Sequence, residues 1–118
     1  MREDIFWVCV VKVKPENFSA FKDVVAPLVA ATKKEPGCLA YEYNVTDDHC
    51  AIHIIEHYRD SAAVIAHVRR TFSKFAENFG ALATVASFVV YGTPNDEARQ
   101  ILDGFGAVYL SRFDGFTH

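Results

Sequence analysis

Apolar and polar positions follow one another along the chain in blocks that predict strands and amphipathic helices. Residues 5–13 are apolar at nearly every position, as in a strand that is buried on both faces. Residues 15–35 then carry apolar side chains at helical spacing, and Pro15 stands in the first turn, where a helix tolerates it. The predicted apolar stripe of this helix is Phe18, Phe21, Val25, Leu28 and Thr32.

A β-hairpin is predicted next. Pro36 and Gly37 end the first helix, because proline lacks the N–H group and glycine tolerates positive φ. Residues 38–45 and 51–58 have strand patterns, and the polar stretch 46–49 between them suits a hairpin connection. The rest of the chain can be placed by how it packs on this hairpin.

A second helix and a fourth strand follow the hairpin. Asp60 or Ser61 is placed to cap the helix, which we expect to run to Asn78, and Gly80 should end or break it. Its predicted apolar stripe is Val64 or Ile65, Val68, Phe72, Phe75 and Phe79. In the strand over residues 84–91, strict alternation would place Val85, Val89 and Tyr91 on one face and Ala86, Phe88 and Val90 on the other.

The order β-α-β-β-α-β predicts an α+β fold of the ferredoxin-like kind, with a four-stranded antiparallel sheet and two helices on one face. Two helices can cover only one face, yet the first and fourth strands are apolar on both. An uncovered apolar face of this size is unusual in a monomer. We therefore expect a homodimer in which two sheets face each other as a dimeric α/β barrel.

Residues 93–118 form a C-terminal extension to the domain predicted over residues 1–92. Thr93 is the expected helix cap, with Pro94 at the first position, and the helix should end near Gly104. Residues 107–110 can add a short strand. The extension is apolar enough to pack on the same or the partner subunit, and to close a pocket, through Phe105, Val108, Tyr109, Phe113 and Phe116.

Composition argues against several classes of protein. The chain has 118 residues and a formal charge of -3, with both signs scattered, which argues against a nucleic-acid surface. No apolar run is long enough to span a bilayer, and the first residues do not resemble a signal peptide. The three cysteines show no C-x-x-C spacing, so we expect reduced thiols in a cytoplasmic protein.

Two residues stand out as candidates for chemistry. His67 borders the apolar stripe of the second helix, where it could face a cavity and act as a general base, or be a flanking histidine with one hydrogen bond. Glu56 shares a strand face with Ile54 and Tyr58, so it is either structurally paired, with Arg59 or a helix-end lysine, or placed near a cavity mouth.

Other candidates have simpler explanations. His53 and His57 share the opposite strand face, but four residues along a strand separate them by roughly 13 Å, too far for one metal ion. We therefore expect no metal. Cys9 on a buried strand lacks the setting of a nucleophile. A group of side chains could line a pocket for an aromatic ligand or simply form core: Trp7, Cys9, Tyr41, Tyr43, Phe72 and Phe75.

The chain resembles the antibiotic biosynthesis monooxygenase family of dimeric α+β barrels. The resemblance rests on E-P-G-C-L-A-Y-E at residues 35–42, I-I-E-H-Y-R-D at residues 54–60 and A-A-x-x-x-H at residues 62–67. It covers roughly residues 5–91. Two features depart from the family pattern: Tyr58 stands where a tryptophan is expected, and no second histidine follows His67 before His118.

The resemblance implies a cofactor-independent monooxygenase that oxidises a quinol or related hydroxylated aromatic with O2. His67 would be catalytic, and the small aromatic substrate would be bound by Trp7, Tyr43, Glu56, Tyr58 and Phe72. The alternative is a non-catalytic homodimer that binds a small molecule on the same scaffold. Haem degradation, known in relatives of this fold, is disfavoured because the chain has no histidine between Val68 and Thr117.

Overall fold

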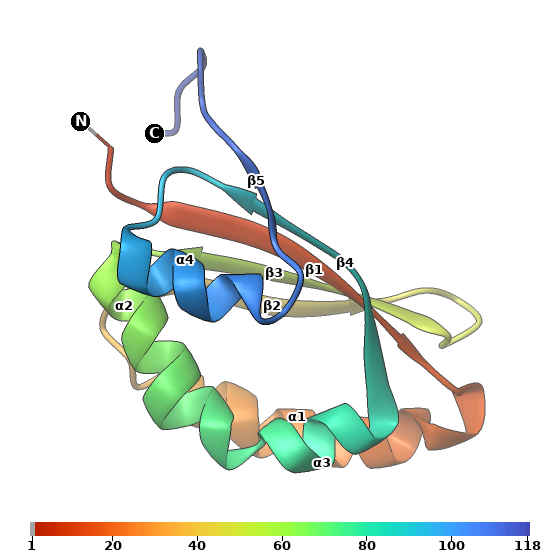
Figure 1. The fold of residues 1–118 in the computed structure, drawn as a ribbon. Helices are drawn as coiled ribbons and strands as arrows, with labels where there is room; N and C mark the ends of the chain where they lie inside the picture. The colour runs from red at the N-terminus through yellow and green to blue at the C-terminus, as the bar shows by residue number, and fades with distance from the viewer. Residues whose placement is uncertain (1) are drawn as a thin grey trace.

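The computed structural model describes residues 2–118. A five-stranded sheet forms one layer, and the helices lie against one of its faces (Figure 1). The strand order is β2-β3-β1-β4-β5, with antiparallel neighbours except for the parallel pair β4–β5. The strands are β1 (Ile5–Val13), β2 (Cys38–Val45), β3 (Ala51–Tyr58), β4 (Ala83–Tyr91) and β5 (Val108–Leu110). The predicted α+β, ferredoxin-like class is confirmed, and β5 is the short strand that the extension was expected to add to the four-stranded sheet.

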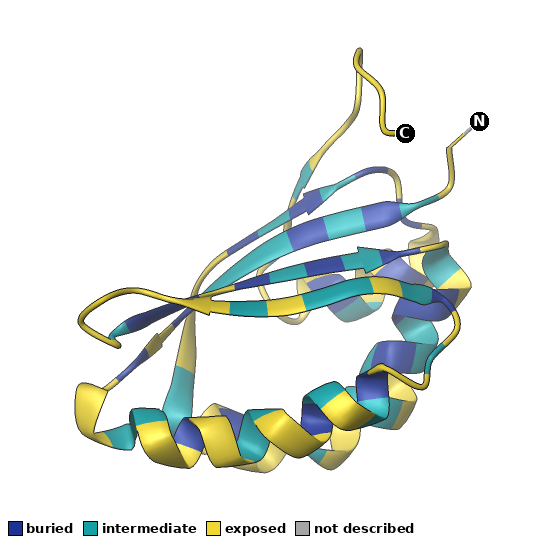
Figure 2. Ribbon diagram, turned by 180° about the vertical axis from the view of Figure 1, so that it is seen from behind, coloured by how far each residue is buried: buried dark blue, intermediate teal, exposed yellow. Residues whose placement is uncertain are grey.

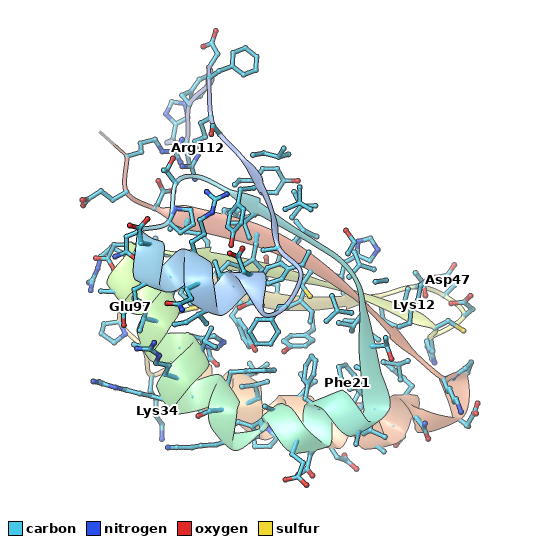
Figure 3. The ribbon with its side chains drawn as sticks, in the orientation of Figure 1. Lys12, Phe21, Lys34, Asp47, Glu97 and Arg112 are labelled. Atoms are coloured by element: carbon cyan, nitrogen blue, oxygen red, sulfur yellow. The ribbon has the colours of Figure 1, made fainter. Side chains whose placement is uncertain are left out.

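The first helical segment agrees with its sequence pattern. A short 3-10 turn, η1 (Pro15–Asn17), leads into α1 (Phe18–Thr32). Phe21, Leu28 and Thr32 of the predicted stripe are buried. Phe21 points from α1 toward the space between helices and sheet (Figure 3).

The second helical segment is not the single helix that the sequence pattern predicts. It consists of α2 (Ser61–Ala66), a π turn η2 (His67–Thr71), a 3-10 turn η3 (Phe72–Lys74) and α3 (Ala76–Leu82). Asp60 caps α2 by accepting a hydrogen bond from the Ala63 N–H. The predicted break at Gly80 is wrong, because α3 continues to Leu82 and β4 begins at the next residue.

A β-bulge interrupts the pairing of β4 with β1. Val10 lies opposite Ser87, but the next residue, Val11, lies opposite Val85, so β4 contains one extra residue. A bulge of this kind breaks the alternation of side chains. Val85 consequently lines the same cavity as Phe88, and the predicted grouping of Val85 with Val89 and Tyr91 is wrong.

The sheet has one face covered by helices and one without a helix. On β1, buried residues alternate with partly exposed ones over the first half of the strand (Figure 2). Phe6 contacts the rings of His57 and Tyr91 from neighbouring strands, with ring centroids 5.9 and 5.8 Å away. The uncovered face is therefore continuous across β3, β1 and β4. We call it the outer face; its half-buried apolar residues include Phe6, Val8, Val10, Ile55, Val89 and Tyr91.

The C-terminal extension packs on the same chain through its helix and its strand. Asn95, and not the predicted Thr93, caps α4 (Asp96–Asp103) by accepting from the Ala98 N–H. Ala98 and Leu102 are fully buried in the core formed with Ile5 and Trp7.

The last residues behave differently from the rest of the extension. Phe113 and Phe116 are 98% and 79% exposed, so they do not pack within the chain. Arg112 returns to the start of β1, where its Nη1 donates to the Asp4 carbonyl at 3.1 Å (Figure 3). Among residues 2–118, no helix is both long and apolar enough to cross a membrane.

Candidate active site

A cavity of about 270 Å³ lies between the sheet and the helices. Strands β1 to β4 supply one side of its lining, and the segment from His67 to Gly80 supplies the other. Leu102 and Phe105 of the C-terminal extension complete it. The lining is predominantly apolar and aromatic, with Trp7, Tyr41, Tyr43, Phe72, Phe79 and Phe88 among its members. Such a cavity suits an uncharged ligand with an aromatic or aliphatic body.

Glu56 is the carboxylate in this lining. It is only 7% exposed, and its Oε1 accepts a hydrogen bond of 2.5 Å from the Tyr58 hydroxyl. Burial raises the pKa of Glu56, while His67, Tyr58 and Trp7 beside the carboxylate offset part of that rise. Glu56 therefore holds a proton more readily than an ordinary glutamate.

His67 lies between two carboxylates. Its Nδ1 is 2.9 Å from Glu35 Oε2, and its Nε2 is 3.7 Å from Glu56 Oε1. His67 is 2% exposed, and its ring packs against those of Tyr41 and Tyr58, with centroids 5.2 and 5.3 Å away. Both imidazole nitrogens thus face an acid, which is a suitable arrangement for general acid–base chemistry.

The π turn begins at His67. The Phe72 N–H bonds to the His67 carbonyl, five residues earlier, and a turn of this kind contains one residue more than an α-helical turn. Single π turns are frequent at functional sites. Here the turn accompanies the placement of both His67 and Phe72 in the cavity lining.

A pair of tyrosines adds hydroxyl groups to the same cavity. Tyr41 and Tyr43 project from β2 on the same face, and their hydroxyl oxygens are 2.8 Å apart. Burial, with the nearby Glu56 carboxylate, raises the pKa of both phenols well above the usual range. Both therefore remain protonated near neutral pH and can donate a hydrogen bond.

The structure brings five of the six predicted site residues together, because Trp7, Tyr43, Glu56, His67 and Phe72 all line the cavity. Tyr58 does not line it and contacts the site through Glu56. The predicted pairing of Glu56 with Arg59 or a lysine is wrong. Instead, Arg59 Nε lies 3.5 Å from Asp60 Oδ2, and Glu56 lies against Tyr58 and His67.

The sequence did not predict Glu35 and Leu102 as residues of the site. Glu35 was assigned to the end of the first helix, and Leu102 belongs to the extension, which has no strong motif. The order of elements does not fix how these two residues approach the site. Phe105 was expected to help close a pocket, and it does line the cavity.

The remaining candidates lie away from this chemistry or are unreactive. His57 is on the outer face, where its Nε2 lies 2.7 Å from Asp4 Oδ2, and His53 is exposed. Over residues 2–118, no group of three or more possible metal ligands occurs. Burial raises the pKa of the Cys9 thiol to about 12 and that of Cys38 to about 11, so thiolate forms of both are disfavoured.

The fold and the cavity define a small α+β protein with an apolar cavity between a sheet and a layer of helices. The family model described as antibiotic biosynthesis monooxygenase matches residues 5–79, and the chain belongs to this family. The resemblance inferred from the sequence is thereby confirmed. No curated protein matches the chain.

Solved structures of similar proteins support the same fold. MupZ from Pseudomonas fluorescens is 21% identical, with a TM-score of 0.87 over 98% of this chain and 95% of its own. A putative antibiotic biosynthesis monooxygenase from Caulobacter crescentus CB15 is 26% identical, with a TM-score of 0.65 over 75% and 86%. A variant of SnoaB, a cofactor-independent oxygenase from Streptomyces nogalater, is 18% identical, with a TM-score of 0.65 over 79% and 95%. The likeness to MupZ includes the C-terminal extension.

Proposed function

We propose that the protein is a cofactor-independent monooxygenase that oxidises a quinol or related hydroxylated aromatic with O2. The observation that carries the proposal is the acid–base pair of Glu56 and His67 in the wall of an otherwise apolar, aromatic cavity. Membership of the monooxygenase family and the likeness to SnoaB support the same reaction class.

The proposed reaction begins with loss of a proton from a substrate hydroxyl at the Glu56–His67 wall. The resulting anion is electron-rich enough to reduce O2 directly, so the proposal assigns no cofactor. Overall, a ring C–H group and the substrate hydroxyl both become carbonyls. One oxygen atom of O2 enters the product, and the other leaves as water with the hydrogens of that C–H group and that hydroxyl.

The apolar lining would favour this chemistry by excluding water and holding the ring in place. Trp7, Tyr43 and Phe72 would contact the aromatic body. Tyr58 would act through its hydrogen bond to Glu56. A phenol O–H of the Tyr41–Tyr43 pair can donate to an oxygen of the substrate.

We also propose that two copies associate through the outer face as a homodimer. This face presents a continuous set of half-buried apolar side chains on β1, β3 and β4, which monomers rarely leave uncovered. The cavity lies on the opposite side of the sheet, so association would leave it intact.

Oxygen consumption tests the proposed reaction. The rate of oxygen consumption with each of a panel of reduced quinols and hydroxylated anthrones is measured with protein and in buffer alone. The proteins are wild type, His67→Gln and the control His118→Ala, which alters an exposed terminal histidine. We expect turnover above autoxidation in wild type and control, and a loss of about 100-fold or more in His67→Gln. Circular dichroism confirms that the variants are folded.

A rate equal to that of buffer for every compound would contradict the monooxygenase proposal. If the same compounds then bind in calorimetry, the protein is a non-catalytic small-molecule-binding protein on this scaffold.

A further inference from the structure

We infer that Glu56, His67 and Glu35 form a proton relay from the cavity to the surface of the protein, with Glu56 as the group that exchanges a proton with the bound ligand. This inference extends the proposed function, because it names the path by which the substrate proton leaves. It makes Glu56 the catalytic base and His67 the carrier.

The first part of the argument is the order of the three groups in space. Glu56 and His67 line the cavity, whereas Glu35 does not. Glu35 follows α1 in a turn next to exposed Lys34, and its own side chain is 17% exposed. The three groups thus form a path that starts at the cavity wall, continues through one buried imidazole and ends at a carboxylate that water can reach.

The second part is the geometry at the imidazole. His67 Nδ1 and Glu35 Oε2 are within hydrogen-bond distance at 2.9 Å. His67 Nε2 and Glu56 Oε1 are 3.7 Å apart, which is less than 1 Å beyond an ordinary hydrogen bond. Catalytic hydrogen bonds commonly tighten only when a ligand is bound. An imidazole can accept a proton on one nitrogen and release another from its second nitrogen.

The third part is that the surrounding groups stay neutral. The thiols and phenols that face Glu56 from β1, β2 and β3 are Cys9, Cys38, Tyr41, Tyr43 and Tyr58, and burial raises the pKa of each. They do not ionise between pH 5 and 9. Movement of a proton in this part of the protein is therefore left to the two glutamates and the histidine.

The proton moves from the ligand to water in three steps, and no proton is gained or lost overall. The ionised Glu56 takes the proton of the ligand hydroxyl and leaves a ligand anion. Glu56 passes the proton to His67 Nε2, which makes the ring a cation. His67 then releases its Nδ1 proton to Glu35, which gives it to water, and exchange of the ring proton between the two nitrogens restores the starting state.

Chemical rescue tests the relay with a compound that the wild-type protein oxidises. We expect Glu35→Gln to lower kcat by about 10-fold or more with KM nearly unchanged. Added imidazole buffer should restore most of the rate, because Glu35 is the end of the path that solvent reaches. Glu56→Gln should lose activity without rescue, and Glu77→Gln, at an exposed position on α3, should match wild type.

The relay is overturned if Glu35→Gln retains the wild-type kcat, or if its loss is not restored by buffer. Either result leaves the monooxygenase proposal standing, since that rests on turnover by wild type.

A second measurement needs no substrate. Nitrogen-15 NMR of the His67 ring follows its protonation from pH 5 to 9 in the free protein. We expect the ring signals to move at the pH where Glu56 ionises, and this step to vanish in Glu56→Gln. Ring signals that are identical in wild type and Glu56→Gln would overturn the relay. Coupled titration in a protein that oxidises none of the test compounds would leave the relay in place and reject the oxidation.

Discussion

At the scale of single residues, Glu56 is subject to opposing influences. Burial favours its neutral form, whereas His67, Tyr58 and Trp7 favour its charged form, and the net result is a raised pKa. A carboxyl group with a raised pKa binds its proton more tightly in the folded than in the unfolded chain. Its contribution to stability is therefore present below the unfolded pKa and is lost as the pH rises through the folded value.

Glu56→Gln should for this reason stabilise the protein more at pH 8 than at pH 5. Glutamine keeps an oxygen that accepts from the Tyr58 hydroxyl but carries no charge to bury. We expect the Tm difference between variant and wild type to grow by about 4 °C between the two pH values, equivalent to roughly 1 kcal/mol. Thermal unfolding followed by circular dichroism measures this difference.

Glu77→Gln serves as the control for that series, because Glu77 is exposed. A Tm difference for Glu56→Gln that is the same at both pH values would contradict the prediction.

The site residues that the sequence predicts correctly are those whose side-chain direction follows from a regular helix or strand. Strand alternation places Glu56 on the same face as Ile54, and helical spacing places His67 beside the stripe, so both could be expected near a cavity. Glu35 could not be expected there, because its contact with His67 joins residues 32 positions apart through a turn. Tyr58 has the right phase but lies too near the end of β3 to line the cavity.

At the scale of elements, two irregularities of one residue each shape the cavity. The bulge in β4 turns Val85 into the cavity lining, and the π turn begins at His67 and leads directly into Phe72. The strands and helices themselves were predictable from apolar periodicity. The irregularities were not, because the pattern on either side of each remains regular and a single extra residue leaves no compositional signal.

The helix α4 and the loop after it have separable roles. Leu102 is fully buried in the core, so Leu102→Ala should lower the free energy of unfolding by about 2–5 kcal/mol. Phe105 is partly exposed and contacts Phe72 and Phe88 at the cavity, with ring centroids 6.1 and 6.3 Å away. Phe105→Ala should instead weaken binding of an aromatic ligand with a smaller loss of stability.

Urea unfolding and calorimetric titration with a hydroxylated aromatic separate these two effects. Leu110→Ala, at a 49% exposed position on β5, is the control that should leave both quantities near wild type. Equal loss of stability in the Leu102 and Phe105 variants would contradict the division of roles.

At the scale of the whole molecule, Asp4 joins residues near the two ends of the chain to the end of β3. Its carboxylate receives Arg2, His57 and Arg112 at 2.9, 2.7 and 3.4 Å. The Arg2 guanidinium, followed by His57 and the Arg112 charge, holds the pKa of Asp4 well below its usual range. A carboxyl group whose pKa is depressed by folding stabilises the protein at pH values above its pKa in the unfolded chain. This contribution is lost as the pH falls from that pKa toward the lower pKa of the folded protein.

Asp4→Asn should thus lower the Tm at pH 7 by an amount corresponding to about 1 kcal/mol or less, as for other partly exposed ion pairs. The difference should shrink as the pH falls from 5 toward 2, and also in 1 M salt, which screens the pairs. Asp23→Asn, at an exposed position on α1, is the control. A deficit that persists unchanged at pH 2 would show that charge is not its cause.

The proposed dimer gives a further expectation at this scale. Ile55→Asp places a charge in the middle of the outer face, so light scattering should show a fall from two chain masses to one. Val45→Asp adds the same charge at the exposed end of β2 and should leave the mass unchanged. A wild-type protein of single-chain mass would contradict the dimer directly.

The π turn at His67 also affects how relatives should be compared. Because it holds one surplus residue, a homologue with an uninterrupted α-helix here would have a chain one residue shorter between the hairpin and β4. An alignment without a gap at this point would shift every position on one side of it by one residue. The counterparts of His67 and Phe72 in other family members are therefore best assigned by superposing structures.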